Sequence, residues 1–123
     1  MEVCGCKFAN RRGIEIIGYQ TKERLSELYE NCKFHVLPSL VETPGISNLE
    51  WCSYGKPIVV GDFPVLHEYF GDSAIFTGFK CSEILKAMRV ALTCSFPVEY
   101  DLSKFGKDCI SAQYMAVIDK LYD

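Results

Sequence analysis

Two glutamates, Glu42 and Glu50, are the residues whose type and spacing most clearly suggest chemistry in this sequence. Seven residues separate them, and Pro44 and Gly45 interrupt that stretch. A proline disfavours helical backbone at the residue before it, and glycine favours a turn, so a single helix is not expected to carry both carboxylates. We therefore expect Glu42 on a loop and Glu50 about one turn inside a helix.

The start of that helix adds a second chemical property. The first N–H groups of a helix have no intrahelical acceptor and favour an anion such as a phosphate. Here they would belong to Gly45, Ile46 and Ser47. Carboxylates on either side do not suit a phosphate, but they accept hydrogen bonds from sugar hydroxyls. The pattern favours a ligand that carries both a phosphate and sugar hydroxyls.

Each glutamate also has a simpler interpretation. Ser47 and Glu50 match the capping box, in which a serine and a glutamate satisfy each other's end of a helix start. Glu42 has no obvious local partner, and most loop glutamates are merely solvated. The sequence alone leaves these alternatives open.

The surrounding pattern predicts the elements that position the two glutamates. Short apolar runs predict strands near residues 13–17, 34–37, 57–60 and 74–77. Helical spacing predicts helices at residues 22–32, 46–54, 65–70, 82–92 and 103–122. Alternating strands and helices with short loops indicate an α/β fold, a parallel sheet with helices on both faces. Ligands bind such sheets at the carboxyl ends of the strands, where Glu42 is expected.

A family resemblance rests on the order and spacing of several segments: Pro38-Ser39, then residues 42–50, the run Gly-Lys-Pro-Ile-Val-Val at 55–60, and residues 68–72. Together they resemble the C-terminal, donor-binding domain of retaining GT-B glycosyltransferases of the "glycosyl transferases group 1" type, which carry an E-x7-E motif. The resemblance runs from about residue 13 to the end. It implies a partial Rossmann-like domain of about four strands, whose N-terminal domain and first strands are absent from this sequence.

The resemblance also implies residue roles. Glu42 would be the catalytic carboxylate near the reacting centre of the transferred sugar. The donor-binding residues would be Gly45, Ile46, Ser47, Leu49 and Glu50, with Glu50 on the ribose hydroxyls. We expect no metal and no cofactor, because the nucleoside-diphosphate sugar is a substrate.

Two features depart from the family pattern. Trp51 stands where the family usually has a small alanine, so the helix must pack differently or face a pocket. The family's phosphate-clamping arginine and lysine lie on earlier strand-end loops. Arg11 and Arg12 lack that strand context, and we do not assign the clamp to them.

The resemblance implies the donor-binding part of an enzyme that moves a hexose from a nucleoside-diphosphate sugar to a sugar, lipid or protein acceptor, inactive as an isolated chain. One alternative is a non-catalytic nucleotide-sugar-binding or scaffolding subunit of a split enzyme. Another is a Rossmann-like module unrelated to sugars, although no Gly-x-Gly-x-x-Gly or Walker loop supports dinucleotides or triphosphates. Because missing strands leave exposed sheet edges, we also expect self-association or a partner chain that completes the sheet.

Composition supports a single globular domain over residues 1–123, with an irregular segment at 1–12. Hydrophobic residues make up 49% of the chain, which argues against disorder, and the net charge of −3 argues against a nucleic-acid partner. No apolar run reaches the ~20 residues of a membrane span. We expect a cytoplasmic protein, peripheral to a membrane only through parts outside this sequence.

The seven cysteines and two histidines are predicted to be structural. An odd number of scattered cysteines does not indicate a disulfide framework, and small buried side chains in a reducing compartment are the favoured interpretation. Cys4 and Cys6 are spaced too tightly for a usual zinc pattern. His35 is expected to pack within a strand, and His67 is not assigned to the site.

Overall fold

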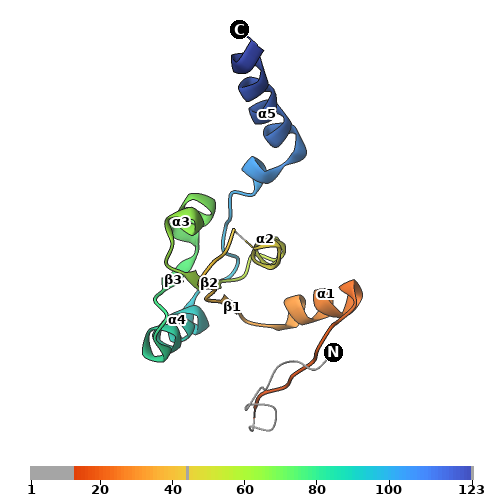
Figure 1. Cartoon of the computed structure of the whole chain (residues 1–123). Coiled ribbons are helices and arrows are strands. Elements are labelled where there is room, and N and C mark those ends of the chain that lie inside the picture. Colours follow the sequence, from red (N-terminus) through yellow and green to blue (C-terminus); the bar gives the residue numbers. More distant parts are fainter. Residues whose placement is uncertain (1–12, 44, 123) are drawn as a thin grey trace. The chain divides into compact units, whose positions relative to one another are not determined.

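The computed structural model describes residues 13–43 and 45–122. Its centre is a parallel sheet with the strand order β1-β2-β3 (Figure 1). The strands are β1 (His35–Leu37), β2 (Ile58–Gly61) and β3 (Ile75–Thr77). Helix α2 (Ile46–Cys52) connects β1 to β2, and α3 (Pro64–Phe70) connects β2 to β3. The α/β class and the parallel sheet predicted from the sequence are confirmed.

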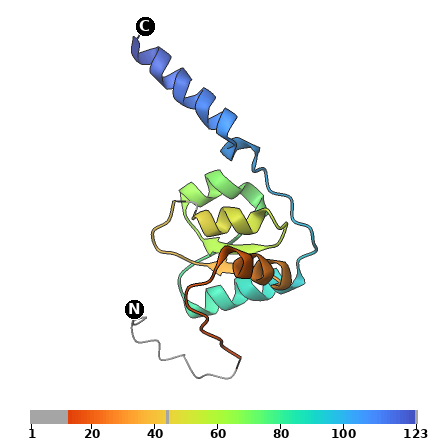
Figure 2. The same cartoon turned by 90° about the vertical axis from the view of Figure 1, so that its right-hand side faces the viewer.

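Helices cover both faces of the sheet. Figure 2 shows α2 in yellow and α3 in green on one side, and α4 (Cys81–Thr93) in teal on the other. On the α4 side, Val59 of β2 packs with Ala87 and Ala91. On the opposite side, His35 of β1 stacks on a ring from α2. All four residues of β2 are buried, as expected for a strand covered on both faces.

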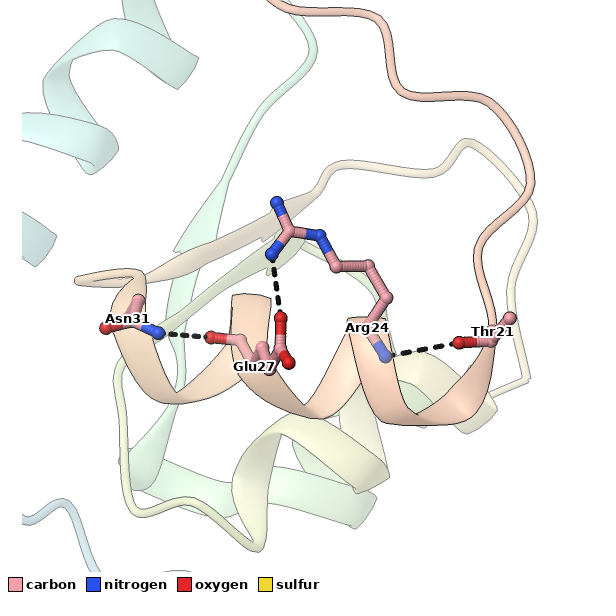
Figure 3. A network of polar contacts seen from close by, with 4 residues as sticks. All are labelled: Thr21, Arg24, Glu27 and Asn31. Carbon is pink, nitrogen blue, oxygen red and sulfur yellow. Dashed lines mark hydrogen bonds and ion pairs between the residues drawn. The ribbon is translucent and has the colours of Figure 1, made fainter.

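The chain divides into two compact units, one ending at Asn31 and the other beginning at Cys32. The first unit contains α1 (Lys22–Asn31), none of whose residues is buried. Local polar contacts hold this helix (Figure 3). The Thr21 hydroxyl accepts a hydrogen bond from the Arg24 N–H at 3.3 Å, and Arg24 pairs with Glu27 at 2.8 Å. The Asn31 side chain donates to the Glu27 carbonyl at 2.7 Å.

The strand predicted at residues 13–17 is wrong, because this segment forms no strand in the described structure. Ile14, Ile16 and Ile17 are 48%, 46% and 42% exposed, so the run lacks the burial on both faces that the prediction assumed. Glycines with positive φ, Gly13 and Gly18, stand at its two ends. The sheet therefore has three strands among the described residues, not about four.

The predicted helices are present, and glycines explain why the bounds of two of them differ from the predicted bounds. Helix α2 ends at Cys52, two residues earlier than predicted, because Gly55 with φ 63° turns the chain and donates to the Cys52 carbonyl at 3.0 Å. The helix predicted at 103–122 is interrupted at Gly106, which is extended. A 3-10 turn, η2 (Ser103–Phe105), precedes it and α5 (Lys107–Tyr122) follows it. A further 3-10 turn, η1 (Gly71–Ser73), follows α3.

Candidate functional site

Glu42 and Gly45 meet just beyond the carboxyl end of β1. Gly45 is the N-cap of α2 and has φ 72° and ψ 118°, a conformation that favours glycine. A Cβ atom at Gly45 would lie 3.2 Å from the carboxyl carbon of Glu42 and 3.0 Å from the side-chain nitrogen of Asn48. The missing side chain therefore lets two polar groups approach the same point of the backbone.

The amides at the start of α2 are not all in the same state. The Gly45 N–H donates to the Thr43 carbonyl, so this amide already has an acceptor within the chain. Ile46 and Ser47 are the first two helical residues, and such amides have no intrahelical acceptor. The Ile46 side chain is 77% exposed. Of the three amides predicted to bind a ligand, those of Ile46 and Ser47 therefore have no acceptor within the helix, and that of Gly45 has the Thr43 carbonyl.

Glu50 does not take part in a capping box. The N-cap of α2 is Gly45 and not Ser47, so the capping interpretation of Ser47 and Glu50 is wrong. Glu50 is exposed on the second turn of the helix, next to the partly buried Leu49. Its backbone carbonyl accepts a hydrogen bond from the Ser53 hydroxyl at 2.6 Å.

The two carboxylates share one property. In the part of the chain that the structure describes, no hydrogen bond or ion pair is recorded for the side chain of Glu42 or Glu50. Glu42 is partly buried and Glu50 is exposed. Both carboxylates therefore retain their full capacity to accept hydrogen bonds from a ligand.

Trp51 packs α2 onto the sheet. It is 2% exposed, and its ring nitrogen donates to the Pro57 carbonyl at 3.1 Å. Its ring stacks on His35 with centroids 5.4 Å apart, and the Lys56 ammonium lies 5.8 Å from its centroid. Of the two arrangements that the sequence left open, the structure shows altered packing, not a tryptophan facing a pocket. The prediction that His35 is a packed histidine is confirmed.

Asn48 is a site residue that the sequence analysis missed. It is 0% exposed and shares the buried face of α2 with Trp51 and Cys52. Burial lowers the pKa of His35, and a polar interaction with the Asn48 side chain opposes that shift. The spacing of three residues between Asn48 and Trp51 places both on one helix face, and this signal could have identified it.

Comparison with known proteins assigns the chain to a family. The family model described as Glycosyl transferases group 1 matches residues 7–94, which include all three strands and both glutamates. The chain belongs to this family. No curated protein and no solved structure matches it. A glycosyl transferase domain implies a role in glycosyl transfer in general, from a nucleotide-sugar donor to an acceptor.

A second polar group of this glycosyl transferase domain follows β2. The ring nitrogen Nε2 of His67 lies 2.6 Å from a carboxylate oxygen of Asp62, and the His67 ring stacks on Phe76 with centroids 3.6 Å apart. Both polar residues are exposed. His67 is thus held by Asp62 and Phe76.

The described residues were also compared with the requirements of a metal site, a disulfide and a membrane-spanning helix. Within residues 13–43 and 45–122, no group of three or more His, Cys, Asp or Glu side chains is arranged to hold a metal ion. The described cysteines, Cys32, Cys52, Cys81, Cys94 and Cys109, are free thiols. Cys4 and Cys6 lie outside the described residues. No described helix is long and apolar enough to cross a bilayer.

Proposed function

We propose that this chain is the donor-binding part of a retaining GT-B glycosyltransferase and that residues 42–50 are its E-x7-E motif. The observation that carries the proposal is the placement of Glu42 in a glycosyl transferase domain. Its carboxylate is partly buried, lies against the Gly45 backbone at the carboxyl end of β1, and accepts no hydrogen bond from the described residues. Glu42 is the catalytic carboxylate, which contacts the transferred hexose.

The remaining site residues suit the rest of the donor. The exposed Glu50 carboxylate accepts hydrogen bonds from the ribose hydroxyls. The backbone of Gly45 meets the diphosphate and sugar, the amides of Ile46 and Ser47 donate to the diphosphate, and Leu49 packs near the nucleoside. The nucleoside-diphosphate sugar is the substrate, and the reaction uses no metal or other cofactor.

We further propose that the chain binds its donor weakly and does not transfer sugar by itself. Its site residues supply two carboxylates and no cation, whereas charge stabilisation on the departing diphosphate is usually a large contribution. Retaining transfer also needs an acceptor held against the reacting carbon, and such positioning can supply several kcal/mol, of order 7–11 in favourable cases. The acceptor site would come from a partner chain, or from a second copy joined at an open sheet edge.

The first experiment is a binding measurement on the free chain. UDP and GDP are titrated into ¹⁵N-labelled protein up to millimolar concentration, with nucleoside-diphosphate hexoses in parallel. We expect amide shift changes centred on Gly45, Ile46 and Glu50. Changes confined to other elements, or no change, would contradict donor binding at this site.

A pair of substitutions separates the two glutamates. Glu50→Gln should weaken nucleoside diphosphate binding by about 1.5–3 kcal/mol, the scale of a hydrogen bond to a charged group. Glu42→Gln should leave that affinity nearly intact and weaken only the sugar-bearing donor. Glu68→Gln, an exposed glutamate on α3, is the matched control. Equal losses from Glu42→Gln and Glu50→Gln would contradict the assigned roles.

Turnover is tested by assaying the purified chain with UDP- and GDP-sugars while light scattering reports its mass. We expect no transfer. Robust transfer by a clean monomer would show that another cation of the chain stabilises the leaving diphosphate.

A further inference from the structure

The proposed donor contacts do not explain why a fully buried position beneath them is an asparagine. Asn48 is 0% exposed, on the face of α2 that packs against the sheet. Burying an amide group without compensating hydrogen bonds costs about 1–3 kcal/mol in proteins, and a leucine, which has a similar branched shape but is larger, would avoid that cost. The side chain therefore serves interactions that an apolar residue could not make.

Asn48 lies close to both Gly45 and Glu42. Its backbone N–H donates to the Gly45 carbonyl at 3.0 Å. Its side-chain nitrogen lies 3.0 Å from the position that a Cβ on Gly45 would occupy, and the nearer Glu42 carboxylate oxygen lies 3.4 Å from the same position. The buried amide and the partly buried carboxylate thus flank one point of the Gly45 backbone.

Asn48 shares the buried face of α2 with Trp51, whose ring stacks on His35 and anchors the helix to the sheet. The Asn48 side chain opposes the lowering of the His35 pKa by burial, although the buried atoms His35 Nε2 and Asn48 Oδ1 form no hydrogen bond within the described residues. Both His35, through its backbone N–H at 3.0 Å, and Trp51, through its ring nitrogen at 3.1 Å, donate to the Pro57 carbonyl. Two hydrogen bonds to one acceptor fix this layer to the start of β2.

We propose that Asn48 is a positioning residue that holds the Gly45 backbone at the start of α2, next to the His35–Trp51 layer, and so fixes where the neighbouring Glu42 side chain lies. The identity of the ligand that Glu42 binds rests on the proposed function, but the positioning role of Asn48 does not. Asn48 is too deeply buried to touch the donor, so it acts through Glu42 and Gly45.

The test compares Asn48→Leu with Ser47→Ala, a control on the same helical turn. Amide hydrogen exchange and ¹⁵N relaxation are measured on the free protein, so no ligand is needed. We expect exchange at Gly45 and Asn48 to accelerate about tenfold or more in Asn48→Leu through local opening, with β2 unchanged. Ser47→Ala should leave both regions unchanged.

Two results would contradict the proposed positioning role of Asn48. Equal acceleration at every amide, including those of β2, would show a purely structural role, and unchanged exchange in the loop would show no role. If Asn48→Leu does not fold, His35→Phe provides the second variant. It keeps a ring to stack on Trp51 and removes the polar atoms facing Asn48, and it should loosen the same loop.

Ligand titration then separates this inference from the proposed function. Asn48→Leu should weaken binding of a nucleoside-diphosphate hexose as Glu42→Gln does, and should spare the nucleoside diphosphate. Loosening of the loop in a protein whose wild type binds no nucleotide sugar would support the positioning role and contradict the donor function. Weakened binding of both ligands to the same extent would contradict the action through Glu42.

Discussion

Gly45 sets the geometry of the proposed site because two polar side chains are placed against its backbone. Its φ of 72° is one that other residues adopt only with strain. The point where a Cβ would lie is also occupied closely by Asn48 and Glu42. Backbone strain and side-chain contact therefore both demand glycine here.

Gly45→Ala should lower the free energy of unfolding by about 1–3 kcal/mol and displace the resonances of Glu42 and Asn48. Gly71→Ala is the matched control, since Gly71 also has positive φ but a Cβ there would meet nothing within 4 Å. Urea unfolding measures the difference between the variants. Equal losses would mean that the contacts with Glu42 and Asn48 contribute nothing.

His35 should make stability depend on pH. Burial lowers its pKa in the folded protein below the ordinary value of 6.5. The unfolded chain therefore binds a proton first as the pH falls, and stability present above about pH 6.5 should decline below it. Urea unfolding from about pH 7.5 to 5 measures this slope, and His35→Phe should reduce it. A slope that is identical in the two proteins would contradict the assignment to His35.

At the scale of single residues, the sequence predicted what depends on residue type and local spacing. The loop position of Glu42, the helical position of Glu50 and the packing of His35 follow from proline, glycine and strand patterns. The capping box failed because Gly45 with positive φ begins the helix two residues before Ser47. Asn48 was missed because the three-residue spacing to Trp51 indicates only a shared helix face, whereas its closeness to Gly45 and Glu42 depends on the tertiary fold.

At the scale of elements, the apolar runs that became strands are those with helices on both sides. β2 lies between the two helical layers and is buried throughout. The run at residues 13–17 has a similar composition but exposed isoleucines, since composition does not specify which strand a run pairs with. Helix ends were predicted less well because glycines at 55 and 106 decide them.

The start of α4 offers a test at this scale. A Glu83 carboxylate oxygen accepts a hydrogen bond from the Lys80 backbone N–H at 3.1 Å, across the first turn of the helix. Glu83→Ala should lower the free energy of unfolding by about 0.5–2 kcal/mol, the range for loss of a cap. Ser82→Ala, at an exposed residue of the same turn, is the control. Thermal unfolding by circular dichroism measures both, and equal melting temperatures would exclude the cap.

At the scale of the whole molecule, burial is distributed unevenly. The largest fully buried side chains belong to β2, to Pro57 just before it and to the helices against it, whereas α1 has no buried residue. Along α5, the apolar side chains of Tyr114, Val117 and Leu121 are 69%, 58% and 75% exposed. Because local opening follows the density of buried contacts, the parts of the chain should open at very different free energies.

Native-state hydrogen exchange should rank these parts. The slowest amides should lie in β2 and the slowest helical amides in the part of α4 that contains Ala87 and Ala91, whereas α1 should exchange fastest. The measurement is made in dilute solution and repeated at higher concentration. Exchange in α5 as slow as that in β2 at every concentration would contradict the ranking.

Because Cys52 is buried, the rate at which its thiol is alkylated reports how often α2 separates from the sheet. This thiol lies on α2 beside Trp51, and burial raises its pKa to about 12. Alkylating reagents attack the thiolate, so Cys52 reacts only when α2 lifts from the sheet, whereas the exposed Cys32 and Cys81 are modified at once. The slow phase of labelling therefore times the opening of the helix that carries Glu50. A donor that binds across the start of α2 should lengthen that phase.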